Sequence, residues 1–312
     1  MQLASALPEL QLDQPACVAI GAFDGVHRGH QALIGGLTRH AHATGRIAVV
    51  LTFFPHPSVV LRGRRPSFYL STPDEKAEYI AALGVDALVT QTFDQNFANV
   101  SAADYVALLV RHARLSELWC GADFALGHGR QGNVPYLQAE GARLGFTVAV
   151  QEPVLMEGEV ISSTRIRQTL RDGAVDAAAR YLGRPFRVTG QVIEGAKRGR
   201  TLGIPTANLA VSDEFAIPAV GVYACRARLA GGGVQSAVTN IGFRPTFNSA
   251  EPKPTVETHV LDYSGDLYGQ SLTLEFIAHL RPEMKFTGVD ALVAQIRQDI
   301  DVARKILVNS EQ

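Results

Sequence analysis

The chain has 312 residues, of which 46% are hydrophobic and 19% are charged, and its formal net charge is −1. This length predicts two domains of ordinary size, and the composition excludes an intrinsically disordered chain. The small net charge disfavours a nucleic-acid partner, because proteins that bind nucleic acid usually carry a basic excess.

The apolar runs are all shorter than about 18 residues, so we expect no membrane span, and the N-terminus lacks the pattern of a secretory leader. Three cysteines, Cys17, Cys120 and Cys225, lie in apolar runs and form no CxxC pair. Buried free thiols are therefore predicted in preference to a disulfide framework or a zinc site. A reducing cytoplasm is the compartment that fits this pattern.

Strands alternate with helices from residue 16 to residue 182. This alternation predicts an α/β domain with a parallel sheet, right-handed crossovers and a ligand crevice at the carboxyl ends of the strands. One helix start, Thr72-Pro73-Asp74-Glu75, has the pattern of a capping box. Strands are expected at 16–20, 47–54, 85–90, 118–120 and 146–150. Helices are expected at about 29–44, from 72, at 101–115 and 134–144, from 162 and at 174–182.

The pattern changes near Gly183-Arg184-Pro185. Short alternating runs separated by Gly and Pro predict a small antiparallel β-barrel, followed by a C-terminal helix. We therefore divide the chain into domains 1–183 and 184–312. Barrel strands are expected at 186–192, 221–229, 235–240, 255–263 and 271–280. One face of the last helix carries Val289, Leu292, Val293, Ile296 and Ile300.

The stretch Gly21–His30, with sequence GAFDGVHRGH, is a glycine-rich turn between the first predicted strand and the first predicted helix. A helix N-terminus at that position favours anions. His27 and His30 add imidazole donors suited to phosphate oxygens. Nucleotidyl transfer fits this turn, because the protein mainly positions the reactants and stabilises negative charge.

A second glycine motif, Gly127–Gly132, matches GxGxxG and is followed by Glu152. It is a rival dinucleotide site. The rival is disfavoured because about six residues separate it from the strand near Cys120, whereas such sites need a tight strand-to-helix turn.

Several motifs together resemble a known family. Gly21–His30 resembles the signature of nucleotidylyltransferases, and in its longer form the FAD synthetase module of bacterial bifunctional riboflavin kinase/FAD synthetases. Ile161–Arg167 resembles the second signature of that superfamily, and Pro205–Asn208 resembles the PTAN motif of riboflavin kinases. The resemblance runs from about Val18 to Arg304, and further matches follow in order at 221–223, 240–246, 256–262, 267–269 and 281–283.

For the first domain, a Rossmann-like nucleotidyltransferase domain, the resemblance implies transfer of AMP from ATP onto FMN, with release of pyrophosphate and formation of FAD. It assigns catalysis to His27, His30 and Arg167, with Arg167 neutralising the outgoing phosphates. An ordinary helix cap is the plainer reading of Ser163, and a surface turn that of His56. Implied nucleotide contacts are Gly21, Phe23, Asp24, Ser163 and Thr164, and implied flavin contacts are His56 and Asp123.

For the second domain, the resemblance implies phosphorylation of riboflavin by ATP. The domain lacks GxxxxGK[ST], so this kinase is not of the P-loop type. The resemblance makes Glu257 the general base, although a surface carboxylate is the plainer reading, and it places Mg²⁺ on Thr206 and Asn208. His259 is interpreted as structural. Implied nucleotide contacts are Gly195, Lys197, Gly199, Gly203 and Asn208, and Arg281 is an implied flavin contact.

Riboflavin, FMN and ATP are thus the expected small-molecule substrates, Mg²⁺ the expected metal, and FMN and FAD the products. One alternative is a nucleotidyltransferase for another phosphorylated acceptor, with the barrel as a flavin-binding module. Another is a flavin sensor without catalysis. The sequence leaves the oligomeric state open.

Overall fold

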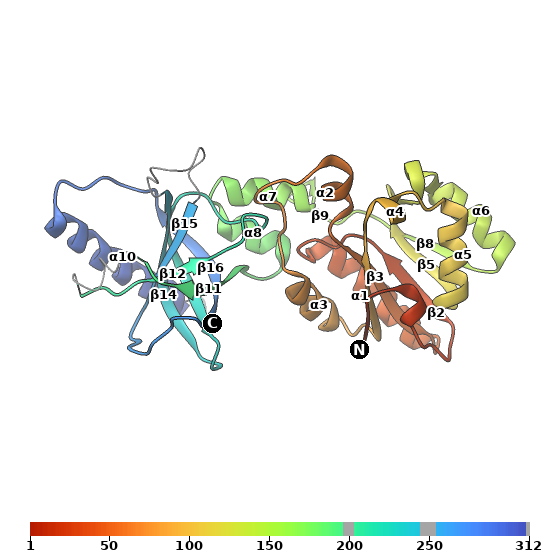
Figure 1. Ribbon diagram of the computed structural model, residues 1–312, viewed down its shortest axis with the longest axis horizontal. Helices are drawn as coiled ribbons and strands as arrows, with labels where there is room; N and C mark the ends of the chain where they lie inside the picture. Colours follow the sequence, from red (N-terminus) through yellow and green to blue (C-terminus); the bar gives the residue numbers. More distant parts are fainter. Residues whose placement is uncertain (196–202, 244–253, 310–312) are drawn as a thin grey trace. The chain divides into compact units, whose positions relative to one another are not determined.

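The computed structural model describes residues 1–195, 203–243 and 254–309, which form two compact units (Figure 1). The first unit comprises Met1–Arg65 and Leu70–Ser163. The second comprises the short segment Pro66–Tyr69 and the residues from Thr164 onward. Helix α8 (Val175–Leu182), which the sequence analysis placed in the first domain, packs on strands of the second unit. The boundary at residue 183 remains a division based on sequence.

A parallel sheet organises the first unit and confirms the predicted α/β class. Within the described residues it has six strands, in the order β1-β4-β3-β2-β5-β8. All five predicted strands are present. They are β2 (Ala16–Ile20), β3 (Ile47–Phe54), β4 (Ala87–Thr92), β5 (Leu115–Gly121) and β8 (Thr147–Gln151). The sixth, β1 (Gln2–Ala4), was not predicted, because three residues at a sheet edge are too short to show a pattern.

Helices cover both faces of this sheet, which explains why its central strands read as continuous apolar runs. In β2, Cys17 and Ala19 pack with α1 (Arg28–Ala43) and α3 (Pro73–Ala81). The alternating residues Val18 and Ile20 pack on the other side. The elements on that side are α5 (Ala102–His112) and α6 (Val134–Leu144).

Two helix starts illustrate what local sequence can and cannot predict. The capping box is confirmed: Thr72 Oγ1 accepts from Glu75 N at 3.1 Å, and Thr72 N donates to the Glu75 carboxylate at 2.9 Å. Pro55-His56-Pro57 ends β3 as predicted, but Pro57 also begins a short unpredicted helix, α2 (Pro57–Arg62). Proline suits a first helical position, so the residue that ends the strand also starts the helix.

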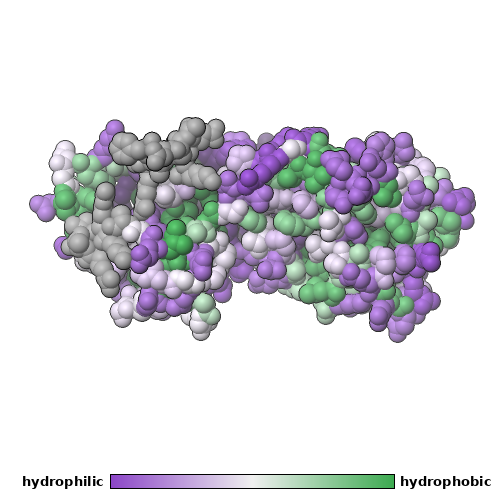
Figure 2. Space-filling view, viewed as in Figure 1, coloured by the Kyte–Doolittle hydropathy of each residue, from purple (hydrophilic) through white to green (hydrophobic). Residues whose placement is uncertain are grey.

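Small elements complete the first unit. They are the helix α4 (Gln95–Ala98), the 3₁₀ turns Leu7–Glu9 and His128–Arg130, and the hairpin strands β6 (Ala125–Leu126), β7 (Gly132–Asn133), β9 (Leu155–Met156) and β10 (Glu159–Val160). On the face shown in Figure 2, apolar and hydrophilic residues of this unit are interspersed, as on ordinary protein surfaces.

The second unit confirms the predicted antiparallel barrel. Among the described residues it is closed by six strands in the order β11-β12-β15-β14-β13-β16. The predicted five are β11 (Phe186–Ile193), β13 (Gly221–Leu229), β14 (Val234–Phe243), β15 (Pro254–Val260) and β16 (Ser271–Arg281). The strand β12 (Ala207–Ala210) was missed, because four residues directly after the Pro205 motif show no alternation.

The C-terminal helix α10 (Val289–Asn309) packs on β13, β14 and β16. The prediction that Val289 lies on the packed face is wrong, because this first helical residue is 57% exposed. The face that meets the barrel includes Ile300 and continues through Asp299, Ala303 and Leu307. In the part of the chain that the structure describes, no helix is long and apolar enough to span a membrane.

Candidate active sites

The turn between β2 and α1 has an unusual backbone. Phe23 and Val26 have φ angles of 46° and 39°, in a region that side chains other than glycine rarely occupy. Surrounding contacts hold this conformation. The Asp24 carboxylate accepts from Leu70 N at 3.0 Å, and Gly25 N donates to Ser71 Oγ at 3.3 Å. A side chain at Gly21 would meet the Phe23 ring at 2.9 Å, so any other residue there would force the ring to move.

A buried lysine supports the same turn through hydrogen bonds to backbone carbonyl groups. Lys76 is only 5% exposed, and its Nζ donates to Ala22 O at 2.9 Å and to Phe53 O at 3.4 Å. Burial lowers the pKa of Lys76, whereas the negative charge of Asp24 raises it. No sequence motif singled out this residue. The available signal was a lysine one helical turn before Ile80, on the buried face of α3.

The two motif histidines lie together at the start of α1. His27 is buried and caps the helix, with its Nδ1 accepting from His30 N at 3.4 Å. That acceptor role puts the proton of the neutral ring on Nε2. The rings of His27 and His30 stack with centroids 3.6 Å apart. The turn therefore presents imidazoles beside the first backbone N–H groups of a helix.

His30 is held in its neutral form. Burial lowers its pKa well below the ordinary value, and electrostatic repulsion from the neighbouring His27 ring and from Lys76 lowers it further. Its Nδ1 is buried and has no hydrogen-bond partner among the described residues. A buried polar atom of this kind costs free energy unless another group satisfies it, so the atom is suited to contact a bound ligand.

The second signature meets this turn through Ser163. The Ser163 hydroxyl donates to Asp24 O at 2.9 Å, although the two residues are 139 positions apart. Ser163 begins α7 (Ser163–Arg171). Thr164 and Arg167 belong to the second unit, where the Arg167 guanidinium donates to Phe68 O and covers the Phe68 ring at 4.1 Å.

The remaining predicted residues of the first unit lie in loops. His56 caps α2, with its Nδ1 accepting from Ser58 N at 3.0 Å. Asp123 is exposed in the loop after β5, and its backbone carbonyl accepts from Arg130 at 2.7 Å. The β6–β7 hairpin and a 3₁₀ turn separate β5 from α6, so Gly127–Gly132 lacks the tight strand-to-helix turn of a dinucleotide site.

In the barrel, Glu257 lies between two asparagines. It pairs with Asn208 of β12 on one side and with Asn240 of β14 on the other. Residues directly opposite one another in antiparallel strands share a face, so the three side chains lie in one row. Their face is opposite the one that carries buried Val256 and Thr258. Asn240 belongs to one of the matching sequence motifs, but no role was predicted for it.

Glycine and proline shape the surroundings of this row. A side chain at Gly195 would overlap the Asn208 amide, so glycine permits the close approach. His259 Nδ1 is 2.7 Å from Pro205 O. Gly203 has a φ of 74°. Lys197 and Gly199 lie outside the described residues.

A cavity of about 520 Å³ lies beside the motif Pro205–Asn208. Thr206 lines it, but Asn208 and Glu257 do not. Its volume is in the range of small-ligand sites. The other lining residues are Val192, Pro205, Ala207, Thr258, Val260 and the loop Tyr263–Tyr268, which the sequence analysis noted only through its Leu267–Gly269 motif.

Arg281, predicted to contact flavin, makes a structural pair. Its guanidinium binds the Asp299 carboxylate through Nε at 3.0 Å and Nη2 at 2.8 Å. The two side chains are 15% and 6% exposed. This pair joins β16 to α10.

Comparisons with known proteins cover both units. Residues 9–165 match the family model described as FAD synthetase, and residues 182–307 match the one described as riboflavin kinase. Three relatives are each described as a bifunctional riboflavin kinase/FMN adenylyltransferase. The Pseudomonas fluorescens protein is 38% identical, covering 99% of both chains. The Escherichia coli K12 protein is 37% identical, covering 95% of this chain and 94% of its own. The Listeria monocytogenes protein is 36% identical, covering 94% and 93%.

A solved structure also resembles the whole chain. It is described as a macrolide-efflux protein from Streptococcus pneumoniae and has a TM-score of 0.86 at 30% identity. The match covers 97% of this chain and 98% of that one.

Proposed function

Because the chain belongs to the bifunctional riboflavin kinase/FMN adenylyltransferase family, we propose that its two reactions occur at two separate sites. The enzyme phosphorylates riboflavin with ATP to give FMN, and it transfers AMP from ATP to FMN to give FAD. The matches to both family models remove the two alternatives, a different acceptor and a flavin sensor without catalysis. We assign the second reaction to the Gly21–His30 turn and the first to the row around Glu257.

In adenylyl transfer, a phosphate oxygen of FMN attacks the α-phosphorus of ATP, and pyrophosphate leaves. Negative charge gathers on the α-phosphate and on the leaving group, so preorganised donors supply the catalysis. His27 offers its Nε2–H, neutral His30 offers a ring N–H, and the start of α1 offers backbone N–H groups. The buried, unpartnered Nδ1 of His30 carries this assignment.

Other first-site roles rest on the sequence motifs. Gly21 and Phe23 shape the turn, and Asp24 holds it in register with Leu70. Ser163 and Thr164 contribute helix N-terminal donors, and Arg167 neutralises the departing phosphates. His56 and Asp123 are proposed flavin contacts.

In the kinase reaction, Glu257 accepts the proton of the riboflavin 5′-hydroxyl while that oxygen attacks the γ-phosphorus of ATP. The Thr206 hydroxyl and the Asn208 amide offer oxygen ligands, which fits Mg²⁺, a hard cation. When bound, Mg²⁺ would neutralise charge on the ATP phosphates. The cavity beside Thr206 is the proposed nucleotide pocket, with further contacts from Gly195, Lys197, Gly199 and Gly203.

We also propose that Arg281 contacts flavin while its guanidinium remains paired with Asp299. A cytoplasmic location is also proposed, because the three buried cysteines are unpaired thiols.

Two substitutions test the assignment. His30→Ala should abolish FAD formation and preserve FMN formation, because only the adenylyl-transfer donors are lost. Glu257→Ala should abolish FMN formation and preserve conversion of added FMN to FAD. Both products are separated by chromatography after incubation with ATP and Mg²⁺. His112→Ala in α5 and the exposed Asp301→Ala in α10 are matched controls that should retain both activities. Loss of both activities in a folded single variant would contradict two separate sites.

A further inference from the structure

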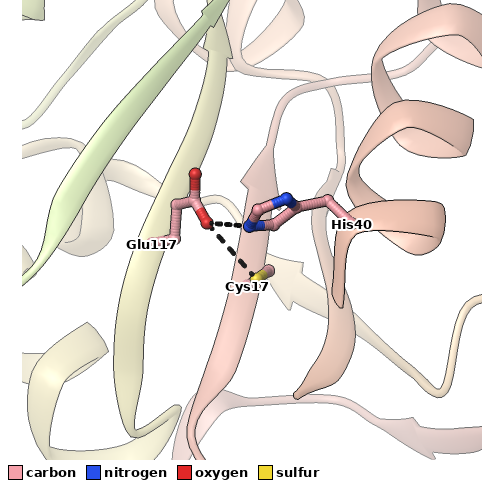
Figure 3. A group of neighbouring side chains, drawn as sticks. All are labelled: Cys17, His40 and Glu117. Carbon is pink, nitrogen blue, oxygen red and sulfur yellow. Dashed lines mark hydrogen bonds and ion pairs between the residues drawn. The ribbon is translucent and has the colours of Figure 1, made fainter. Parts of the chain in front are cut away.

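Three metal-ligating side chains form a cluster in the first unit (Figure 3). Cys17 comes from β2, His40 from the last turns of α1, and Glu117 from β5. Their ligand atoms all lie within 4.8 Å of one another. At 1.5 Å per helical residue, His40 lies about 20 Å along α1 from His27, so the cluster is separate from the Gly21–His30 turn.

The spacing of these atoms is close to that of a tetrahedral metal site. Glu117 Oε2 lies 3.7 Å from Cys17 Sγ and 2.7 Å from His40 Nε2. Typical zinc bond lengths place neighbouring ligand atoms about 3.3–3.8 Å apart. The sulfur–oxygen distance already meets this range, and the nitrogen–oxygen distance must open by about 1 Å or less. The remaining pair, Cys17 Sγ and His40 Nε2, lies within 4.8 Å, so it must close by about 1 Å at most.

Burial and ligand chemistry favour one class of ion. Cys17 is fully buried and the Glu117 side chain is 13% exposed, whereas the His40 side chain is 39% exposed. Cys17 and Glu117 are held in place at the buried end of the cluster. The exposed side at His40 gives an ion an entry path and a position for a water ligand. Thiolate, imidazole and carboxylate together select Zn²⁺ over Mg²⁺ or Ca²⁺.

Arg46 is the main competitor for the carboxylate. Its guanidinium lies 3.3 Å from Glu117 Oε2, the oxygen that also contacts Cys17 and His40. Cys17, His40 and Arg46 thus converge on one carboxylate oxygen. Because this place is already polar, a dication would enter it at a lower cost in free energy than it would enter an apolar core. The Arg46 side chain is 34% exposed, so it can turn towards solvent when an ion binds.

We propose that Cys17, His40 and Glu117 form a three-ligand Zn²⁺ site with a water as fourth ligand, linking β2, β5 and α1. Coordination replaces the thiol proton of Cys17, which leaves to solvent, and breaks the His40–Glu117 hydrogen bond. The sequence disfavoured a zinc site because no two cysteines are close in the chain. The fold brings the ligands together from positions 17, 40 and 117.

Cobalt binding tests the site without relying on activity. The full chain, treated with chelator and reductant and freed of both, is titrated with Co²⁺ in the absence of nucleotide. We expect thiolate-to-cobalt charge-transfer absorption that saturates at one ion per chain and disappears when Zn²⁺ is added. Thr206 and Asn208 carry no sulfur, so the kinase motif cannot produce this signal.

Variants separate this site from nonspecific binding. Cys17→Ser should abolish the absorption, and His40→Gln should weaken binding by more than the roughly 10–100-fold that a lost supporting group costs. Arg46→Gln should tighten binding, because it removes the competing cation. Cys120→Ser, at another buried thiol, is the matched control and should bind as the unchanged protein does. If Cys17→Ser fails to fold, the half-exposed His40→Gln decides the question. A missing signal in the unchanged protein, or equal binding by folded Cys17→Ser or His40→Gln, would overturn the proposal.

Discussion

At the scale of single residues, the first site depends on a buried charge that does not itself belong to either signature. Lys76 bonds the carbonyl of Ala22, next to the strained Phe23, and its charge helps to keep His30 neutral. Its hydrogen bonds hold the turn in its left-handed conformation, while Asp24 offsets part of the cost of burying the ammonium group. We therefore regard Lys76 as a positioning residue for adenylyl transfer.

The variant Lys76→Met tests this role. Loss of a charged hydrogen bond costs about 1.5–3 kcal/mol, so FAD formation should fall by roughly 10–100-fold. Removal of the positive charge should also raise the pKa of His30, although burial still holds it below the ordinary value. Steady-state rates of FMN adenylylation across the pH range measure both effects, since the acidic limb of the profile should move to higher pH. Riboflavin phosphorylation should not change, and exposed Glu78→Met on the same helix is the control. An unaltered pH profile would contradict the electrostatic role.

At the scale of elements, the Arg281–Asp299 pair fastens α10 to the barrel. Gln295 adds a hydrogen bond to the same carboxylate at 3.0 Å, so the polar groups inside this contact are mutually satisfied. Ala303 and Leu307 continue the buried face of α10 beyond Asp299 and pack in an apolar cluster with barrel residues. Removal of one partner leaves the other charge poorly solvated, which is costlier than removal of both.

We expect Asp299→Ala to lower the free energy of unfolding of the second unit by about 3 kcal/mol. The double variant Arg281→Leu/Asp299→Leu should recover a large part of this loss, because no charge then remains unpaired. Denaturant unfolding followed by circular dichroism measures both values. Equal stability of the single and double variants would contradict a buried ion pair. A change in the KM for riboflavin with unchanged stability would instead favour a flavin-binding role for Arg281.

At the scale of the whole molecule, the proposed assignment gives each unit one of two consecutive reactions, with FMN as product of the first and substrate of the second. A mixture of His30→Ala and Glu257→Ala proteins should therefore convert riboflavin to FAD, although neither protein does so alone. FMN should accumulate first and FAD should follow after a lag, as measured by chromatography of timed samples. If the mixture stops at FMN while the Glu257→Ala protein adenylates added FMN, transfer of FMN through solvent is disproved.

The sequence predicted the elements with long or strongly patterned stretches. β2, β3, α3 and α6 are examples, because apolar runs, proline and capping residues are local signals. The short β1 and β12 escaped prediction, because three or four residues are too few to show a pattern. The same limit applies to the sites. The Gly21–His30 motif is continuous in the sequence and can be recognised there, whereas Lys76, the row of Asn208, Glu257 and Asn240, and the Cys17 cluster come together only through tertiary contacts.

The open sheet has edge strands and the closed barrel has none among its described strands, and this difference affects how the chain would aggregate. The described barrel strands close on themselves, so every strand has neighbours on both sides. The open sheet ends at β1, only three residues long, and at β8, which pairs with β5 alone among the named strands. Unpaired strand edges are templates for other chains. Misassembly through strand addition should therefore begin at β8 of the first unit rather than in the barrel.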